Sequence, residues 1–124
     1  MYKLFLSIGS ISGGLAVMIG AFAAHALKNT LTSTGRLETF ETAVKYQFYH
    51  ALALLLLGII MLNLKNEIFN YAGYSFVLGT VIFSGSLYIL CLTGITKFGM
   101  ITPIGGLFLI LGWALLLIGV LKST

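Results

Sequence analysis

The sequence predicts an all-α integral membrane protein, a bundle of four transmembrane helices. The first observation is that the few charged residues leave four uncharged stretches, at 4–27, 46–64, 68–96 and 98–121. A helix of roughly 20 apolar residues spans the hydrocarbon core of a bilayer, and even the shortest stretch has 19 residues. The second observation is composition, because 59% of the residues are hydrophobic and only 8% are charged. So few charges cannot cover the surface of a protein in water.

The 124 residues are expected to form one domain, with spans at about 4–27, 43–64, 69–94 and 102–121. Four spans put both termini on the same side of the membrane. Three basic residues lie on that side and four on the other, so the positive-inside rule is nearly balanced. We favour cytoplasmic termini in the cell (inner) membrane. The basic residues are scattered, which argues against nucleic-acid binding and leaves the lipid bilayer as the expected surroundings.

A polar segment at 28–45 separates the first two spans, and it reads as a loop up to about residue 34. Beyond that point Leu37 and Phe40 fall on one helical face, while Glu41 and Lys45 fall on another. We therefore expect an amphipathic segment at the membrane interface that leads into the second span.

Small residues recur at helical spacing in the first and fourth spans. In the fourth span glycines repeat every seven residues, and in the first span small residues repeat every four. Because lipid supplies no hydrophobic drive between helices, such residues favour close helix packing. The predicted packing positions are Gly13, Gly20, Gly105, Gly112 and Gly119.

Helix direction gathers most polar side chains at one end of the bundle, the end with the long polar segment. Thr102 opens the fourth span there, and we expect it to cap the free amides of that helix. The aromatic residues mostly lie near span ends, as in an interfacial belt, and Trp113 is the exception. The candidate polar or ligand site consists of His25, Glu41, Lys45, Tyr46, Gln47, His50, Ser84, Ser86, Tyr88 and Thr102.

His50 is the most distinctive of these residues. It lies roughly one to two turns inside the expected membrane interface, so its ring needs a hydrogen-bonding partner. Tyr46 and Gln47 are local candidates, and His25 and Ser84 are candidates on other helices. One interpretation is a buried histidine that ties two helices together. The other is a titrating or ligand-binding group, since imidazole changes charge near neutral pH.

Other site chemistry has less support in the sequence. His25 and His50 could ligate a metal ion or haem, but no second His pair or Cys/Met ligand set accompanies them. We therefore predict no metal site and no cofactor. Glu38 and Glu41 lie beside Arg36 and Lys45 at the headgroup layer, which favours solvated ion pairs over a carboxylate pair for acid–base chemistry. No catalytic residue is predicted.

The chain resembles a known family of small four-helix bacterial membrane proteins that is defined only as a conserved domain of unknown function. The matching stretches are GAFAAHAL at 20–27, 41–54 with its YQFYHALAL, FSGSLYILCLTG at 83–94, and ITPIGG at 101–106 followed by Gly112-Trp113. They touch all four spans, so the resemblance covers nearly the whole chain. The family typically has glycine where this chain has Ala23 and Ala26. The resemblance implies a multi-pass inner-membrane protein and implies no particular reaction.

Three classes of function remain open. We rank first a non-enzymatic protein that packs with copies of itself, with other membrane proteins or with lipid, through the small-residue stripes of its first and fourth spans. The second is a transporter or channel for a small solute or protons, built around Glu41, Gln47 and His50. The third is an enzyme, or a protein that holds a metal or cofactor, and it would use the histidines.

Overall fold

A computed structural model describes residues 1–123 of the chain, and within them it contains helices and no strand. The elements are α1 (Tyr2–Ala24), α2 (Lys28–Ser33), α3 (Leu37–Asn63), α4 (Ile68–Thr93), the 3-10 helix η1 (Thr96–Met100) and α5 (Thr102–Lys122). In this part of the chain four helical segments are long and apolar enough to cross a membrane. The predicted all-α, four-helix class is confirmed.

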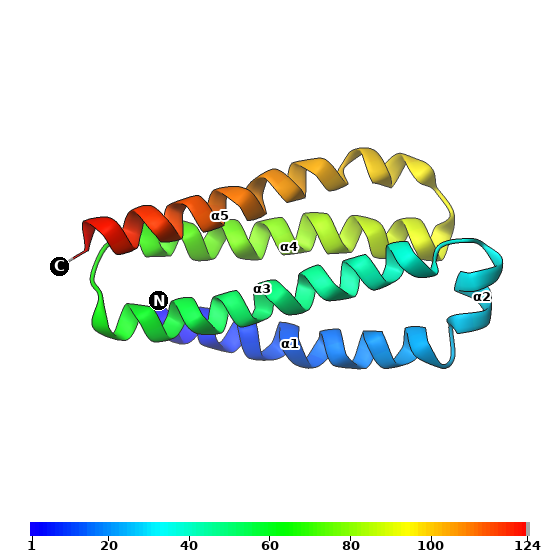
Figure 1. The fold of residues 1–124 in the computed structure, drawn as a ribbon, viewed down its shortest axis with the longest axis horizontal. Helices are drawn as coiled ribbons and strands as arrows, with labels where there is room; N and C mark the ends of the chain where they lie inside the picture. Colours follow the sequence, from blue (N-terminus) through cyan, green and yellow to red (C-terminus); the bar gives the residue numbers. More distant parts are fainter. Residues whose placement is uncertain (124) are drawn as a thin grey trace.

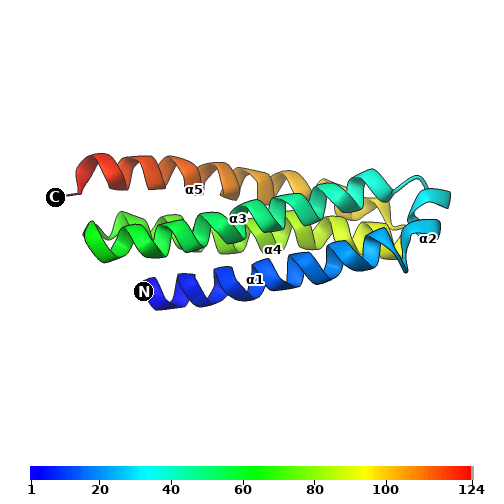
Figure 2. The same ribbon diagram turned by 60° about the horizontal axis from the view of Figure 1, so that its bottom comes forward.

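The four long helices run antiparallel to their chain neighbours, with α3 and α4 at the centre of the bundle. α1 packs mainly on α3 and α5 mainly on α4, while contacts between α3 and α4 join the two pairs. Figures 1 and 2 show α1 and α5 on opposite sides of this central pair. Both termini lie at one end of the bundle, which we call the terminal end, and α2 and η1 lie at the other, the loop end (Figure 1).

The connection at the loop end differs from the prediction of a loop up to about residue 34. α2 forms in that segment because Leu31 is buried against Phe40, Ala23 and Cys91, which anchors one side of the short helix. The chain then reverses at Gly35, whose φ of 71° lies in the left-handed region that favours glycine. The amphipathic segment expected before the second span forms the first turns of α3 itself.

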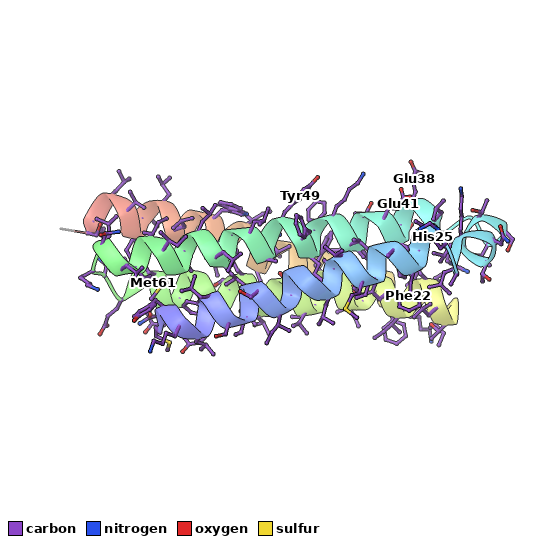
Figure 3. All side chains as sticks on the ribbon, turned by 90° about the horizontal axis from the view of Figure 1, so that it is seen from below. Phe22, His25, Glu38, Glu41, Tyr49 and Met61 are labelled. Atoms are coloured by element: carbon purple, nitrogen blue, oxygen red, sulfur yellow. The ribbon has the colours of Figure 1, made fainter. Side chains whose placement is uncertain are left out.

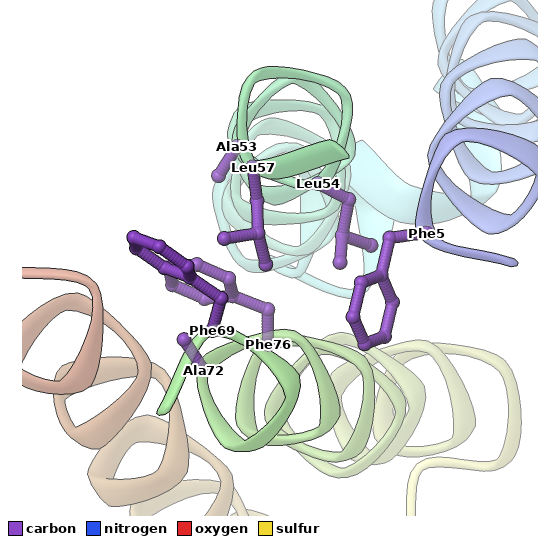
Figure 4. Close-up of a cluster of buried hydrophobic side chains, with 7 residues drawn as sticks. All are labelled: Phe5, Ala53, Leu54, Leu57, Phe69, Ala72 and Phe76. Atoms are coloured by element: carbon purple, nitrogen blue, oxygen red, sulfur yellow. The ribbon is translucent and has the colours of Figure 1, made fainter. Parts of the chain in front are cut away.

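Two apolar clusters hold the ends of the bundle. At the terminal end, Phe5 from α1 meets side chains of α3 and α4, and Figure 4 shows its ring directed toward α4. The members of this cluster are Phe5, Ala53, Leu54, Leu57, Phe69, Ala72 and Phe76. At the loop end, the second cluster surrounds Leu31 and Phe40. Most of the buried polar side chains lie between these two clusters.

The glycine stripe of α5 packs against a phenylalanine stripe of α4 that has the same seven-residue spacing. A Cβ atom on Gly112 would lie 2.6 Å from the Phe76 ring, and one on Gly119 would lie 2.7 Å from the Phe69 ring. At the third step, a Cβ on Gly105 would lie 2.8 Å from the Cα of Phe83, which is backbone. Side chains at these glycines would force α4 and α5 apart. The stripe is therefore used inside the molecule, and it is not a free surface for a partner.

The small residues of α1 divide between an inner and an outer side. A Cβ on Gly9 would lie 2.8 Å from the carbonyl oxygen of Ala51, so this glycine allows the closest approach to α3. Gly20 is nearly as tight, since its Cβ would lie 3.3 Å from Val44, whereas Gly13 leaves ordinary space at 3.7 Å from Ala51. The predicted packing positions of α1 therefore face α3, but the tightest contact is at Gly9.

Candidate functional site

The ring of His50 connects α3 to α5 from the middle of α3. Its Nδ1 lies 2.8 Å from the carbonyl oxygen of Tyr46, one turn earlier in the same helix. Its Nε2 lies 3.1 Å from Nε1 of Trp113 on α5. The side chain is only 5% exposed, and it packs against the rings of Phe76 and Trp113. Both ring nitrogens therefore have a partner.

These partners determine where the proton of the neutral ring lies. An indole N–H can only donate a hydrogen bond, so Nε2 of His50 must accept from Trp113. A backbone carbonyl can only accept, so Nδ1 must carry the proton and donate to Tyr46. The imidazole is thus held as the Nδ1–H tautomer. Trp113 is the partner that the sequence analysis did not assign to His50, although its position away from the aromatic belt was the available signal.

Gln47 joins three helices one turn before His50. Its Nε2 donates to the carbonyl oxygen of Ser12 on α1, at 2.9 Å. Its Oε1 accepts from the hydroxyl of Tyr88 on α4, at 2.6 Å. Gln47 is 6% exposed, so this amide satisfies polar atoms from α1 and α4 inside an apolar surrounding.

Two serines of α4 form further hydrogen bonds between helices. The buried Ser84 hydroxyl donates to the carbonyl oxygen of Ala43 on α3, at 2.7 Å. The Ser86 hydroxyl lies 2.6 Å from Oγ1 of Thr102 on α5. Thr102 also lies within the helix and bonds back to the carbonyl of Phe98 at 3.3 Å, so it does not cap the free amides as predicted. It instead ties the start of α5 to α4.

The other predicted site residues lie apart from these cross-links. His25 is exposed at the loop end, where Figure 3 shows it near Glu38 and Glu41 and away from the middle of α3. Because Gly20 of α1 lies opposite Val44 of α3, His25 is level with the first turn of α3. That is about 16 Å along the helix axis from His50, so the two imidazoles do not form one site.

The two charged members of the predicted site also take no part in these hydrogen bonds between helices. Glu41 and Lys45 are exposed on α3, and Figure 3 shows the Glu41 side chain at the edge of the bundle. Tyr46 is itself 40% exposed, and it takes part through its carbonyl and through its ring, which packs against the Phe83 ring of α4 in a tilted arrangement. The site therefore reduces to the buried residues of α3 and α4 with their partners.

Most of the chain matches a family of known proteins. Residues 19–106 match the family model described as "Protein of unknown function (DUF423)". The chain belongs to this family. It is 47% identical over 120 residues to the UPF0382 membrane protein SSP2132 of Staphylococcus saprophyticus, a match that covers 97% of this chain and 98% of the relative.

A more distant relative matches over the same number of residues. The chain is 37% identical over 120 residues to the UPF0382 inner membrane protein YgdD of Escherichia coli strain K12, covering 97% of this chain and 91% of the relative. No solved structure matches the chain. The resemblance found in the sequence is confirmed, and the chain is a multi-pass membrane protein of a family whose activity is unknown.

In this member of the family, the arrangement of the polar residues does not favour a metal site or a ligand site at His50. Within residues 1–123 no three or more His, Cys, Asp or Glu side chains gather as metal ligands would. The main surface cavities of the same residues are lined by side chains other than His50. A ligand or metal at Nε2 would first have to displace Trp113.

One cavity does reach the polar cross-links from another side. It is a groove of about 380 Å³ between α1 and α4, with α3 as its floor. Thr80 lines this groove, and its Oγ1 is buried without a hydrogen-bond partner among the described residues. The lining residues are Ile8, Ile11, Ser12, Leu15, Ile19, Gln47, Leu54, Val77, Thr80, Val81, Ser84, Gly85 and Tyr88. Sequence analysis missed the groove and Thr80, because both depend on the gap that α1 leaves beside α4.

Proposed function

We propose that the protein is a non-enzymatic packing protein of the inner membrane, whose buried polar residues hold its own helices together. The observation that carries this proposal is the double engagement of the His50 ring by Trp113 and Tyr46. A proton carrier or metal ligand needs a nitrogen that can exchange its partner, and both nitrogens here are bonded in a buried position. Gln47 likewise holds helices together, because its amide bonds to both α1 and α4.

The surface left for a partner lies on the outer side of α1. Ser7, Gly14 and Ala21 are spaced by seven residues and are exposed on that side. A Cβ on Gly14 would meet nothing within 4 Å, so another helix could approach closely there. We infer that a second copy of the chain, or a helix of another membrane protein, packs on this side. The glycine stripe of α5, which faces α4, takes no part in such contacts.

A two-part experiment in liposomes tests the proposal. In the first part, protein labelled with donor and acceptor dyes reports self-association by energy transfer. We expect energy transfer for the wild type, a loss for Gly14→Leu, and no change for Gly85→Leu, which places the same side chain on α4. A monomer at every protein-to-lipid ratio would contradict packing with copies of itself.

The second part tests the alternative of transport through His50. Proton flux is measured in liposomes that contain the wild type, His50→Ala, or no protein. The proposal predicts equal flux in all three, because His50 is a cross-link between helices. Flux that the wild type adds and His50→Ala removes would overturn the proposal in favour of a transporter.

A further inference from the structure

We propose that the groove between α1 and α4 binds one uncharged single-chain amphiphile from the bilayer, with its polar group at the Gln47 end. The proposal concerns a different surface from the outer side of α1, and it stands independently of self-association. It rests on the shape of the groove, on the distribution of polar atoms along it, and on the absence of charge among its lining residues.

The shape of the groove limits the occupant to one chain. The lining residues of α4 run from Val77 to Tyr88, which is about 16 Å along the helix. A volume of about 380 Å³ over that length leaves a cross-section suited to one extended hydrocarbon chain. The groove runs parallel to the helices, as lipid chains do, and it is open on its lipid side. A hydrocarbon chain can therefore enter from the bilayer without passing through water.

Packed aromatic side chains lie near both ends of the groove. At the terminal end, Phe5 spans from α1 to α4, where it packs on Gly73 and meets the Tyr74 ring at a centroid distance of 5.6 Å. At the loop end, Tyr88 packs on Phe40 at a centroid distance of 5.1 Å. These contacts mark the two ends of the lined segment of α4, residues 77–88.

The polar atoms lie toward one end. Leu54 and Val77 line the terminal end, and the polar side chains of Thr80, Gln47, Ser84 and Tyr88 line the rest of the groove toward the loop end. The carbonyl of Ser12 takes one of the two amide hydrogens of Gln47, and the second can point to a ligand oxygen. A chain with a polar group at one end would match this gradient, and its polar end would lie nearest the loop-end interface.

Thr80 supplies a second, independent observation. Its Oγ1 is a buried side-chain atom without a partner in residues 1–123, although serines and threonines elsewhere in these helices bond back to a carbonyl one turn earlier. An unpaired hydroxyl in an apolar surrounding is unfavourable. Other atoms of Thr80 line the groove, and a rotation about its χ1 would turn the covered hydroxyl toward it. An acceptor oxygen on a bound amphiphile, such as an ester carbonyl, would then satisfy this hydroxyl. None of the lining residues carries a charge, so an uncharged polar group is favoured over a carboxylate or phosphate.

Two glycines provide matched variants for the test. Gly85 lines the groove, and a Cβ there would meet nothing within 4 Å, so Gly85→Leu fills the groove without disturbing helix contacts. Gly14 has equal space but lies outside the groove, so Gly14→Leu is the control. The readout is photolabelling in liposomes with a diazirine-bearing monoacylglycerol, followed by mapping of the labelled peptides.

We expect labelling of segment 77–88 in the wild type that excess monoolein abolishes and that an excess of a straight-chain hydrocarbon of equal length does not. Gly85→Leu should lose this competable labelling, and Gly14→Leu should keep it. Competition by monoolein and hydrocarbon to the same extent would mean that bulk lipid chains fill the groove, and this would overturn the proposal. Competable labelling that persists in Gly85→Leu would overturn it as well. Neither result depends on whether the protein self-associates.

Discussion

At the scale of single residues, the His50–Trp113 contact explains why an imidazole can be buried in the middle of a transmembrane helix. A neutral imidazole has one donor and one acceptor, and both would be unsatisfied in hydrocarbon. The Tyr46 carbonyl and the Trp113 indole satisfy one each. The residue thus binds α5 to α3, two helices that otherwise contact each other little, because the main partner of α5 is α4.

A double-mutant cycle measures this contact. Hydrogen bonds between transmembrane helices average about 0.6 kcal/mol and reach about 1.7 kcal/mol. We expect His50→Ala and Trp113→Phe to show a coupling free energy of about 1 kcal/mol in unfolding from mixed micelles. The control pair is Tyr49→Phe with Trp113→Phe, since Tyr49 is exposed one residue away and its effects should simply add. Additive effects in the His50 pair would show that the hydrogen bond contributes nothing.

For Thr80 we predict that removal of a hydroxyl group increases the stability of the protein. Its buried hydroxyl has no partner in the described part of the chain, so removing it should relieve an unfavourable burial. Thr80→Val, which keeps the shape of the side chain, is expected to raise the free energy of unfolding by about 1 kcal/mol in lipid-free micelles. Ser84→Ala is the comparison, because the Ser84 hydroxyl is bonded to Ala43 and its loss should lower stability. A loss of stability in Thr80→Val would mean that its hydroxyl is satisfied.

At the scale of helices, the α4–α5 seam depends on glycine at particular positions and on helix rotation. Gly105 faces the backbone of Phe83, which cannot move aside, whereas a Cβ on the adjacent Gly106 would make ordinary contact with the Phe83 ring at 3.7 Å. Gly105→Ala should therefore lower the free energy of unfolding by about 2 kcal/mol through overpacking. Gly106→Ala should change it by less than about 0.5 kcal/mol. Equal effects in the two variants, measured by unfolding in micelles, would contradict this seam.

The same seam shows where sequence reasoning succeeded and where it stopped. The seven-residue glycine spacing predicted a packing stripe, because spacing depends on one helix alone. It could not show that Phe69, Phe76 and Phe83 form the matching stripe, since pairing depends on which helix lies alongside. Once Gly112 faces Phe76, the next residue, Trp113, turns toward α3 and reaches His50. The groove and the displacement of His25 from His50 depend likewise on how α1 lies against α3 and α4.

At the scale of the whole molecule, the fold predicts how the chain is exposed on the two sides of the membrane. The loop end carries α2 and η1, and the terminal end carries both termini with the short link at residues 64–67. Single cysteines at Ser33 and Lys97 should react with an impermeant thiol reagent from one side, and those at Lys65 and Ser123 from the other. We propose that the second side is the cytoplasm. The native Cys91 is buried, and Cys91→Ser removes it from the assay. Labelling of Ser33→Cys and Lys65→Cys from the same side would contradict the four-span fold.

The polar residues of this bundle act as bonds between its own helices, and the state of one imidazole tests that claim most directly. The measurement is nitrogen NMR of the His50 ring in liposomes at neutral pH, with His25→Gln removing the other histidine signal. We predict a neutral ring with the proton on Nδ1, an unprotonated Nε2, and a change in the Nε2 signal when Trp113→Phe removes its donor. A ring protonated on Nε2, or a signal that Trp113→Phe leaves unchanged, would contradict the account.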